Sequence, residues 1–267
     1  MPTTPSLPSV SQAWVRALLQ WWGGWREVIH FGAQILVLAL SPSSYRRSQR
    51  QPMVRAAYQA TMPVLPSFTV LSALVALVII RIVLATSLSY GLSRYALDVL
   101  VRTLVLELIP LSAALFAAVR YAMPAGEQVR SMRLAGEFEA QFAAGLDPTR
   151  DTVLPRAIAG MFSVFTLAAV SSAMTLVLAY FSVYGFSTWG LGGFTRTVGQ
   201  VFNPVIVLIF SLKTLFLSLA VAIIPMVPTP REGAAGAPQT NADIIRLARL
   251  LAVVLLIEML SLVGNYY

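Results

Sequence analysis

The sequence predicts an all-α membrane protein, and its composition and hydropathy pattern support this prediction. Of its 267 residues, 57% are hydrophobic and only 11% are charged. A water-soluble domain of this size cannot bury so many apolar side chains, and the mean hydropathy is +0.75. A membrane-spanning helix needs about 20 mostly apolar residues. Five runs of this kind follow one another along the chain, at 64–87, 96–122, 157–183, 201–227 and 244–263.

The segment before the first run is expected to form an amphipathic helix that lies in the membrane interface. Its large apolar residues recur every three or four positions, at Trp14, Leu18, Trp21, Trp22, Trp25 and Ile29. Tryptophan prefers the headgroup level because its ring is apolar and its N–H needs a partner. The alternative is a sixth span at 31–40, but this run is too short to cross. Residues 1–60 are thus expected to be a cytoplasmic N-terminal region, and 61–267 a five-span domain.

The arginines predict how the spans are oriented. A cytoplasmic N-terminus puts 14 of them on the cytoplasmic side, at Arg16, Arg26, Arg46, Arg47, Arg50, Arg55, Arg120, Arg130, Arg133, Arg150, Arg156, Arg231, Arg246 and Arg249. Three fall on the outer side, at Arg94, Arg102 and Arg196. The positive-inside rule favours this topology, which leaves the C-terminus in the periplasm. Because the arginines flank spans, we expect lipid headgroups and no nucleic acid to balance the net charge of +8.

The composition also argues against enzyme chemistry. The chain has no cysteine and one histidine, His30, which excludes disulfides, thiolate metal sites and cysteine nucleophiles. No G-x-x-x-x-G-K-[ST] phosphate-binding loop is present. We therefore predict no catalytic residue, metal or cofactor, and expect any ATP hydrolysis to take place on a separate chain.

A short amphipathic segment, GEFEAQFAAGLDPTRDTVLPR, separates the second and third runs. On a helical wheel Leu134, Phe138 and Phe142 share one face. Arg133 and Glu137 are four residues apart and can pair along the polar side. The segment therefore predicts either a helix resting on the membrane surface or a helix that docks on a cytoplasmic partner. The spacing alone does not separate the two.

Helix boundaries are predicted on the C-terminal side of this segment. Gly145 suits a left-handed helix C-cap. Asp147 and Pro148 are typical of an N-cap followed by proline in the first turn. Pro155 repeats this signal, so the third span is expected to start there.

Several ionisable residues fall within the spans, where charge costs about 2.5 to 3.5 kcal/mol. Glu107 is either hydrogen-bonded inside the helix bundle or lines a path for lipid. Pro110 removes one backbone hydrogen bond and is expected to kink the span there. Lys213 is too deep to snorkel, so it should meet Glu107, a lipid phosphate or water. Arg81 is expected to snorkel outward, and Glu258 is a weaker candidate.

Several motifs occur in an order and spacing known from one family. LVLELIP, which carries Glu107 and Pro110, is similar to L-R-E-L-G-P. The stretch 118–148 can be laid without a gap on A-G-R-x-G, A-E-x-G-x-M, E-Q-I-D-A-L and D-P, and Lys213 falls on a K-S step. With these motifs the chain resembles MlaE-type permeases. These are the membrane subunits of ABC transporters that move lipids with mammalian-cell-entry (MCE) proteins.

The resemblance implies a homodimer in the bacterial inner membrane, a cytoplasmic ABC ATPase, a periplasmic MCE-domain protein and a phospholipid cargo. We expect a lipid path at Glu107, Lys213, Arg81 and Pro110, of which Glu107, Lys213 and Pro110 fall on family motifs. The resemblance also implies a cytoplasmic coupling helix between spans 2 and 3, which contacts the ATPase through Arg120, Arg133, Leu134, Glu137, Phe138, Glu139, Phe142, Asp147 and Pro148. The chain departs from the family pattern mostly on cytoplasmic surfaces, at Leu106, Ile109, Val119, Ala122, Gln128, Gly136 and Glu139.

Two other functions stay open. A secondary transporter would usually show inverted repeats and more intramembrane ionisable groups, and we detect no internal repeat. A non-transporting membrane scaffold would need neither Glu107 nor Lys213 at depth.

Overall fold

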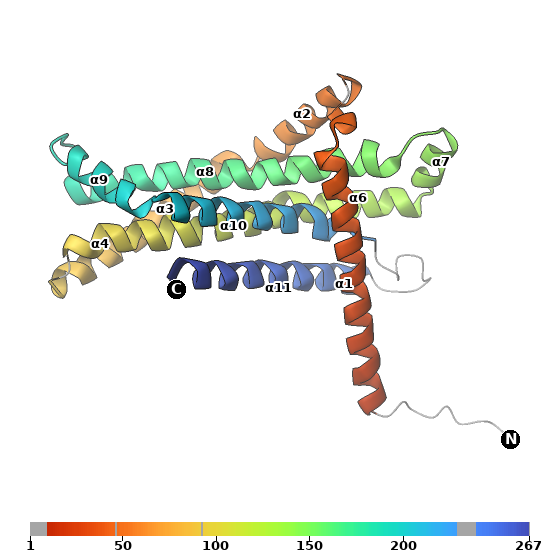
Figure 1. Cartoon of the computed structure of the whole chain (residues 1–267), viewed down its shortest axis with the longest axis horizontal. Helices are drawn as coiled ribbons and strands as arrows, with labels where there is room; N and C mark the ends of the chain where they lie inside the picture. Colours follow the sequence, from red (N-terminus) through yellow and green to blue (C-terminus); the bar gives the residue numbers. More distant parts are fainter. Residues whose placement is uncertain (1–9, 46, 92, 229–238, 267) are drawn as a thin grey trace.

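Long helices, packed side by side, make up most of the molecule (Figure 1). The computed structural model describes residues 10–45, 47–91, 93–228 and 239–266. Every regular element in these ranges is helical. Five helical stretches are long and apolar enough to cross a membrane: Arg50–Ser89, Tyr95–Leu134, Thr149–Tyr184, Pro204–Met226 and Asp243–Gly264. The predicted all-α class with five spans is confirmed.

The elements follow the chain in a simple order. The first part comprises α1 (Val10–Leu40), the 3₁₀ turn η1 (Pro42–Tyr45), α2 (Arg47–Thr61) and α3 (Leu65–Ser89). The second span runs through α4 (Ser93–Leu100), η2 (Val101–Leu108), α5 (Ile109–Ala117), η3 (Ala118–Ala122) and α6 (Met123–Leu134). The third follows α7 (Glu137–Ala143) and comprises η4 (Thr149–Val153) and α8 (Leu154–Tyr184). The remainder is α9 (Leu191–Val201), α10 (Pro204–Ile223), the 3₁₀ turn η5 (Ile224–Met226) and α11 (Gln239–Tyr266).

Helix α1 runs across the direction of the long helices (Figure 1). This is the orientation expected of a helix in the membrane interface, and its placement there stays a prediction. The alternative of a separate short span at 31–40 is wrong, because these residues are the C-terminal part of α1. Phe31 and Ile35 on this part are buried and join α1 to the bundle. The division of the chain at residue 60 also stays a prediction.

Three stretches of π-helix, η2, η3 and η4, each end two residues before a proline. Ile109, Met123 and Leu154 donate their N–H groups to carbonyls five positions earlier, and proline follows each of them. Proline has no N–H, and its ring clashes with the carbonyl four positions earlier in an α-helix. A wider turn relieves this clash and lets the helix continue.

These wide turns overturn two predicted helix ends. The second span was expected to end at 122, yet the helix continues through Pro124 to Leu134. The third span was expected to start at Pro155, yet it begins at Thr149. In both places proline lies inside a helix that the π turn has widened, so it does not act as a terminus.

The two ends of the bundle differ. At one end lie α4 and α9, and at the other lie α1 and α7, which we term the α7 end (Figure 1). Helix α9 lies in the glycine-rich stretch that joins the third and fourth spans. Asn203 then caps α10, since its side chain accepts a hydrogen bond from the N–H of Ile206 at 2.9 Å.

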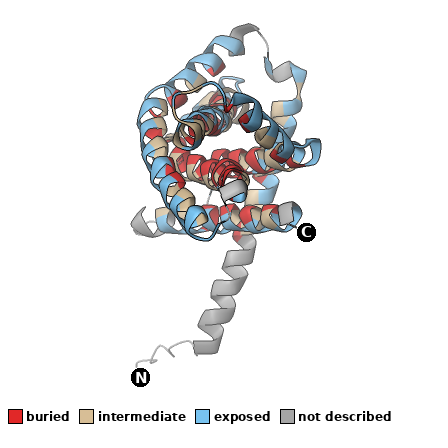
Figure 2. Cartoon of the chain, turned by 90° about the vertical axis from the view of Figure 1, so that its left-hand side faces the viewer, coloured by how far each residue is buried: buried red, intermediate tan, exposed pale blue. Residues whose placement is uncertain are grey.

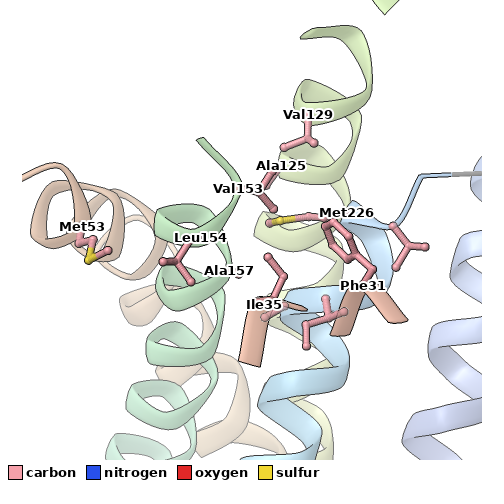
Figure 3. Packing of buried hydrophobic residues seen from close by; sticks show 12 residues of the cluster. Phe31, Ile35, Met53, Ala125, Val129, Val153, Leu154, Ala157 and Met226 are labelled. Carbon is pink, nitrogen blue, oxygen red and sulfur yellow. The ribbon is translucent and has the colours of Figure 1, made fainter. Parts of the chain in front are cut away.

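Buried residues line the inside of the bundle, and exposed residues face outward (Figure 2). At the α7 end, one apolar cluster joins α1, α2, α6, α8 and η5. Figure 3 shows Phe31 and Ile35 of α1 near Met226, and Met53 of α2 beside Leu154 of α8. This cluster holds the crossing helix and the start of the first span against the second and third spans.

Candidate functional site

A buried lysine contacts two buried glutamates that come from two other spans. Lys213 of α10 is 3% exposed, while Glu107 of η2 and Glu258 of α11 are each 9% exposed. The Nζ atom of Lys213 donates to Oε1 of Glu258 at 2.9 Å and to Oε2 of Glu107. These three side chains form the ion cluster, which ties the second, fourth and fifth spans together.

Pro110 supplies the third acceptor of the ion cluster. In an α-helix the carbonyl of Leu106 would accept the N–H of residue 110, but proline has none. Lys213 Nζ instead donates to this carbonyl at 3.2 Å. An ammonium group has three N–H donors, so each has an acceptor inside the protein. The proline therefore shapes the helix and also prepares a polar site for the lysine.

The ion cluster contains two carboxyl groups and one ammonium group. Oε2 of Glu258 is buried without a hydrogen-bond partner in the described part of the chain. In a low-dielectric interior each of these groups depends on the others for its stability. An anionic ligand can bind Lys213 here only by taking the place of one carboxylate.

The sequence-predicted residues of the lipid path separate into two groups. The predicted contact between Lys213 and Glu107 is confirmed. Pro110 is linked to the same lysine, because it leaves the carbonyl of Leu106 free to accept from Lys213. Arg81 lies elsewhere, exposed on α3 next to the fully buried Ile80. Glu258, which the sequence marked only as a weaker candidate, is a full member of the ion cluster. Whether these residues line a path for lipid stays a prediction.

The predicted amphipathic segment is divided between two helices. Helix α6 ends at Leu134, and Gly136 adopts a left-handed conformation with φ of 74° before α7 begins. The predicted common face is therefore wrong. Phe138 is half-buried and packs against the apolar cluster at the α7 end, whereas Leu134 and Phe142 are 54% and 62% exposed.

Arg133 points toward the protein interior. It donates to the carbonyl of Met226 at 2.9 Å, and its guanidinium lies 5.5 Å from the ring centre of Phe138 and 5.9 Å from that of Phe31. The prediction placed Arg133 and Glu137 on one helix, and this is wrong, because Arg133 lies on α6 and Glu137 on α7. Arg133 instead joins α6 to α1, α7 and η5.

The remaining residues predicted for coupling lie mostly on the surface. Arg120, Glu137, Glu139 and Asp147 are exposed, and Pro148 is buried.

The predicted helix boundaries at Gly145 and Asp147 are confirmed. Gly145 has a φ of 76°. The N–H groups of Gly145 and Leu146 donate to the carbonyls of Phe142 and Gln141, both at 3.0 Å, which is the Schellman pattern. The carboxylate of Asp147 accepts the N–H of Thr149 at 3.0 Å, as an N-cap does.

Two further contacts hold α6 in place and were not predicted. A side chain at Gly126 would lie 2.3 Å from the carbonyl oxygen of Pro225, so only glycine allows this approach. Glu127 lies 3.6 Å from Arg246 of α11 and 3.2 Å from Arg130. The three-residue spacing of Glu127 and Arg130 is a signal for their pairing, but no sequence signal shows that α6 meets Pro225 and Arg246.

Comparison with known proteins agrees with this architecture. A search of the curated proteins finds no match. The family model described as Permease MlaE matches residues 53–239, well over half of the chain. This range includes Glu107, Lys213 and the whole α6–α7 segment. The chain therefore belongs to the MlaE permease family and is a multi-pass permease subunit of an ABC transporter.

Proposed function

We propose that this permease subunit moves phospholipids between the bacterial inner membrane and a periplasmic MCE-domain protein, as a homodimer driven by a separate cytoplasmic ATPase. The observation that carries the proposal is the ion cluster. Ionisable groups inside membrane spans are costly and mark substrate pathways. A lipid fits such a pathway, because its apolar chains match the spans and its charged headgroup matches the ion cluster. Two-fold closure is the commonest way to build such an assembly.

The chemistry of the ion cluster supports exchange with a lipid phosphate. A phosphate that reaches Lys213 replaces one carboxylate, and the displaced glutamate then repels the lipid's negative charge. Lipid binding would therefore break a contact between α10 and either η2 or α11, and lipid release would restore it. The apolar faces of the spans accommodate the acyl chains.

The α6–α7 segment supports coupling to the ATPase. Leu134 and Phe142 present exposed apolar side chains beside the acidic Glu137 and Glu139, a surface suited to a partner protein. On the inner side, Arg133 contacts α1 and η5. Movement of α7 would therefore reach the crossing helix and the end of the fourth span. The arginine distribution supports a cytoplasmic position for this surface.

Lipid transfer in vesicles tests the proposal. The permease is reconstituted with its ATPase and MCE protein, and ATP-dependent transfer of a labelled phospholipid is measured. The triple variant Glu107→Gln, Lys213→Met, Glu258→Gln removes every charge of the cluster and leaves no unpaired ion. We expect it to lose at least about 10-fold of the transfer rate, equivalent to 1.4 kcal/mol, and to keep its ATPase bound.

The outcomes separate the three functions. Unchanged transfer by the triple variant would overturn the role of the ion cluster. Transfer without nucleotide would favour a secondary transporter, and its absence in the unmodified complex would favour a scaffold. Arg50→Gln is the matched control, because Arg50 is exposed on α2 and belongs to neither proposed site.

A further inference from the structure

A second polar site lies at the α7 end, formed by residues other than those of the ion cluster. It is a pocket of about 460 Å³ between α2, the η3–α6 junction and the η4–α8 junction. Arg55 and Gln59 line it from α2, and Tyr121, Asp151 and Arg156 line it from the second and third spans. The pocket lies at one end of the bundle, where we expect the spans to meet the membrane surface.

The pocket carries a positive charge suited to an anion. Two arginines and one aspartate line it, which leaves one excess positive charge. Arg156 donates to the carbonyl of Thr152 at 2.8 Å and contacts Met132 Sδ at 3.9 Å. A guanidinium has five N–H donors, so these two contacts leave three for a ligand. The hydroxyl of Tyr121 donates to the carbonyl of Arg156 at 3.0 Å and fixes the backbone beneath it.

Helix α2 presents an apolar stripe beside the pocket. Residues 52, 55, 56 and 59 share the face that lines the pocket. Val54 and Tyr58 of α2, and Met62 directly after its end, follow one another at four-residue spacing on a neighbouring face, and each is at least half exposed. A ligand with a phosphate in the pocket and hydrocarbon chains beyond it would meet both faces of this helix.

The walls of the pocket are held in place from within. Two of the wide turns, η3 and η4, contribute Tyr121, Asp151 and Thr152 to its lining, and π turns are frequent at functional sites. Ala125 of the lining belongs to the apolar cluster of the α7 end, as do Met53 and Leu154, the chain neighbours of the lining residues Pro52 and Pro155 (Figure 3). The three walls therefore cannot drift apart without disrupting this core.

We infer that this pocket binds the headgroup of an anionic phospholipid from the adjacent leaflet. Arg55 and Arg156 hold the phosphate through charge-assisted hydrogen bonds, and the acyl chains lie along the stripe of Val54, Tyr58 and Met62. Asp151 weakens the binding and makes it reversible. The site does not use the ion cluster, so it stands whether or not the chain transports lipid.

Binding of short-chain lipids to the purified full-length protein in detergent tests this inference. The probes are dihexanoyl phosphatidylglycerol, dihexanoyl phosphatidylcholine and inorganic phosphate, and native mass spectrometry gives the dissociation constants. We expect the phosphatidylglycerol to bind most tightly. Arg55→Gln and Arg156→Gln should each weaken it about 10-fold, as expected for loss of a hydrogen bond to a charged group. Arg50→Gln is the matched control on α2 and should change nothing.

The reverse change guards against damage to the fold. Asp151→Asn removes the like charge and should tighten phosphatidylglycerol binding several-fold, which a misfolded protein cannot do. The inference is overturned if neither arginine variant alters binding or if Asp151→Asn leaves it unchanged. Equal binding of phosphatidylcholine would show that the apolar stripe acts alone. Equal binding of inorganic phosphate would identify a site for free anions.

Discussion

The ion cluster and the charged contacts at the α7 end are both built from basic residues paired with glutamates, but they differ in how far water reaches the glutamates. Lys213, Glu107 and Glu258 are all buried. At the α7 end, Arg246 is buried, but the side chain of its partner Glu127 is 45% exposed. Water can replace a lost partner at the end of the bundle and cannot do so in the middle. We therefore expect an unpaired charge to cost most in the middle of the bundle, and the loss of close packing or of an aromatic contact to cost more than the loss of a charge at the α7 end.

The largest effect should follow removal of the lysine from the ion cluster. Lys213→Met leaves two buried carboxylates without a cation, and breaking a buried pair in this way costs about 3 to 5 kcal/mol. We expect a large fall in the temperature of unfolding, measured by tryptophan fluorescence in detergent.

The neutral triple variant is the control for this prediction. Replacing a whole buried ion group by uncharged residues of similar size is often close to neutral, so it should unfold near the temperature of the unmodified protein. A single variant as stable as the triple one would show that the charges are not isolated from water.

Close packing at the α7 end is tested by Gly126→Ala. The new methyl group would lie 2.3 Å from the carbonyl oxygen of Pro225, and overpacking against backbone costs about 1 to 3 kcal/mol. Gly199→Ala in α9 is the matched control, since nothing lies within 4 Å of its added carbon. We expect only the first variant to lower the unfolding temperature, and equal behaviour would contradict the close approach.

A smaller effect should follow Arg133→Gln. This variant loses the two cation–π contacts, each worth about 0.5 to 1 kcal/mol at an accessible site, but its amide can still donate to Met226. Limited proteolysis should cut the α6–α7 turn faster. Cleavage at an unchanged rate would mean that Phe138 is held by apolar packing alone.

The smallest effect is expected for Glu127→Gln. Arg246 keeps a second carboxylate, Asp243 at 3.6 Å, and the side chain of Glu127 is 45% exposed. An ion pair with one exposed partner contributes about 0.2 to 1 kcal/mol and is screened by salt. The variant should differ from the unmodified protein in low salt and match it in 1 M salt. Lys213→Met should remain destabilised in both, because its partners are buried. If Glu127→Gln lowers the unfolding temperature equally at low and high salt, the pair is shielded from water as the ion cluster is.

The sequence predicts the fold better than the site, and the reason lies in the kind of signal each leaves. Apolar runs identify all five spans because the bilayer demands them. The paired Glu107 and Lys213 could be predicted because isolated charge at that depth is costly. Glu258 carries the same cost but was ranked lower, since nothing in a sequence says which faces of separate helices meet.

The α6–α7 segment shows where a periodic pattern fails. The wheel that joined Leu134, Phe138 and Phe142 assumed one unbroken helix, and the left-handed Gly136 interrupts it. The opposite error occurred at Pro155, which indicated a helix start, and at residue 122, where the second span was expected to end; the π turns carry the helix through both places. Both errors arise because the effect of a glycine or proline on a helix depends on the backbone conformation around it. That conformation is set by three-dimensional packing, which the sequence alone does not show.

The wide turns before Pro110, Pro124 and Pro155 have a consequence for comparing relatives of this chain. Each such turn holds one residue more than an α-helical turn would. A relative that lacks one of these prolines can delete that residue and keep the register of its inward-facing side chains. A relative that keeps the proline cannot. Single-residue gaps in alignments of the family should therefore coincide with loss of the matching proline, and a gap beside a retained proline should be absent.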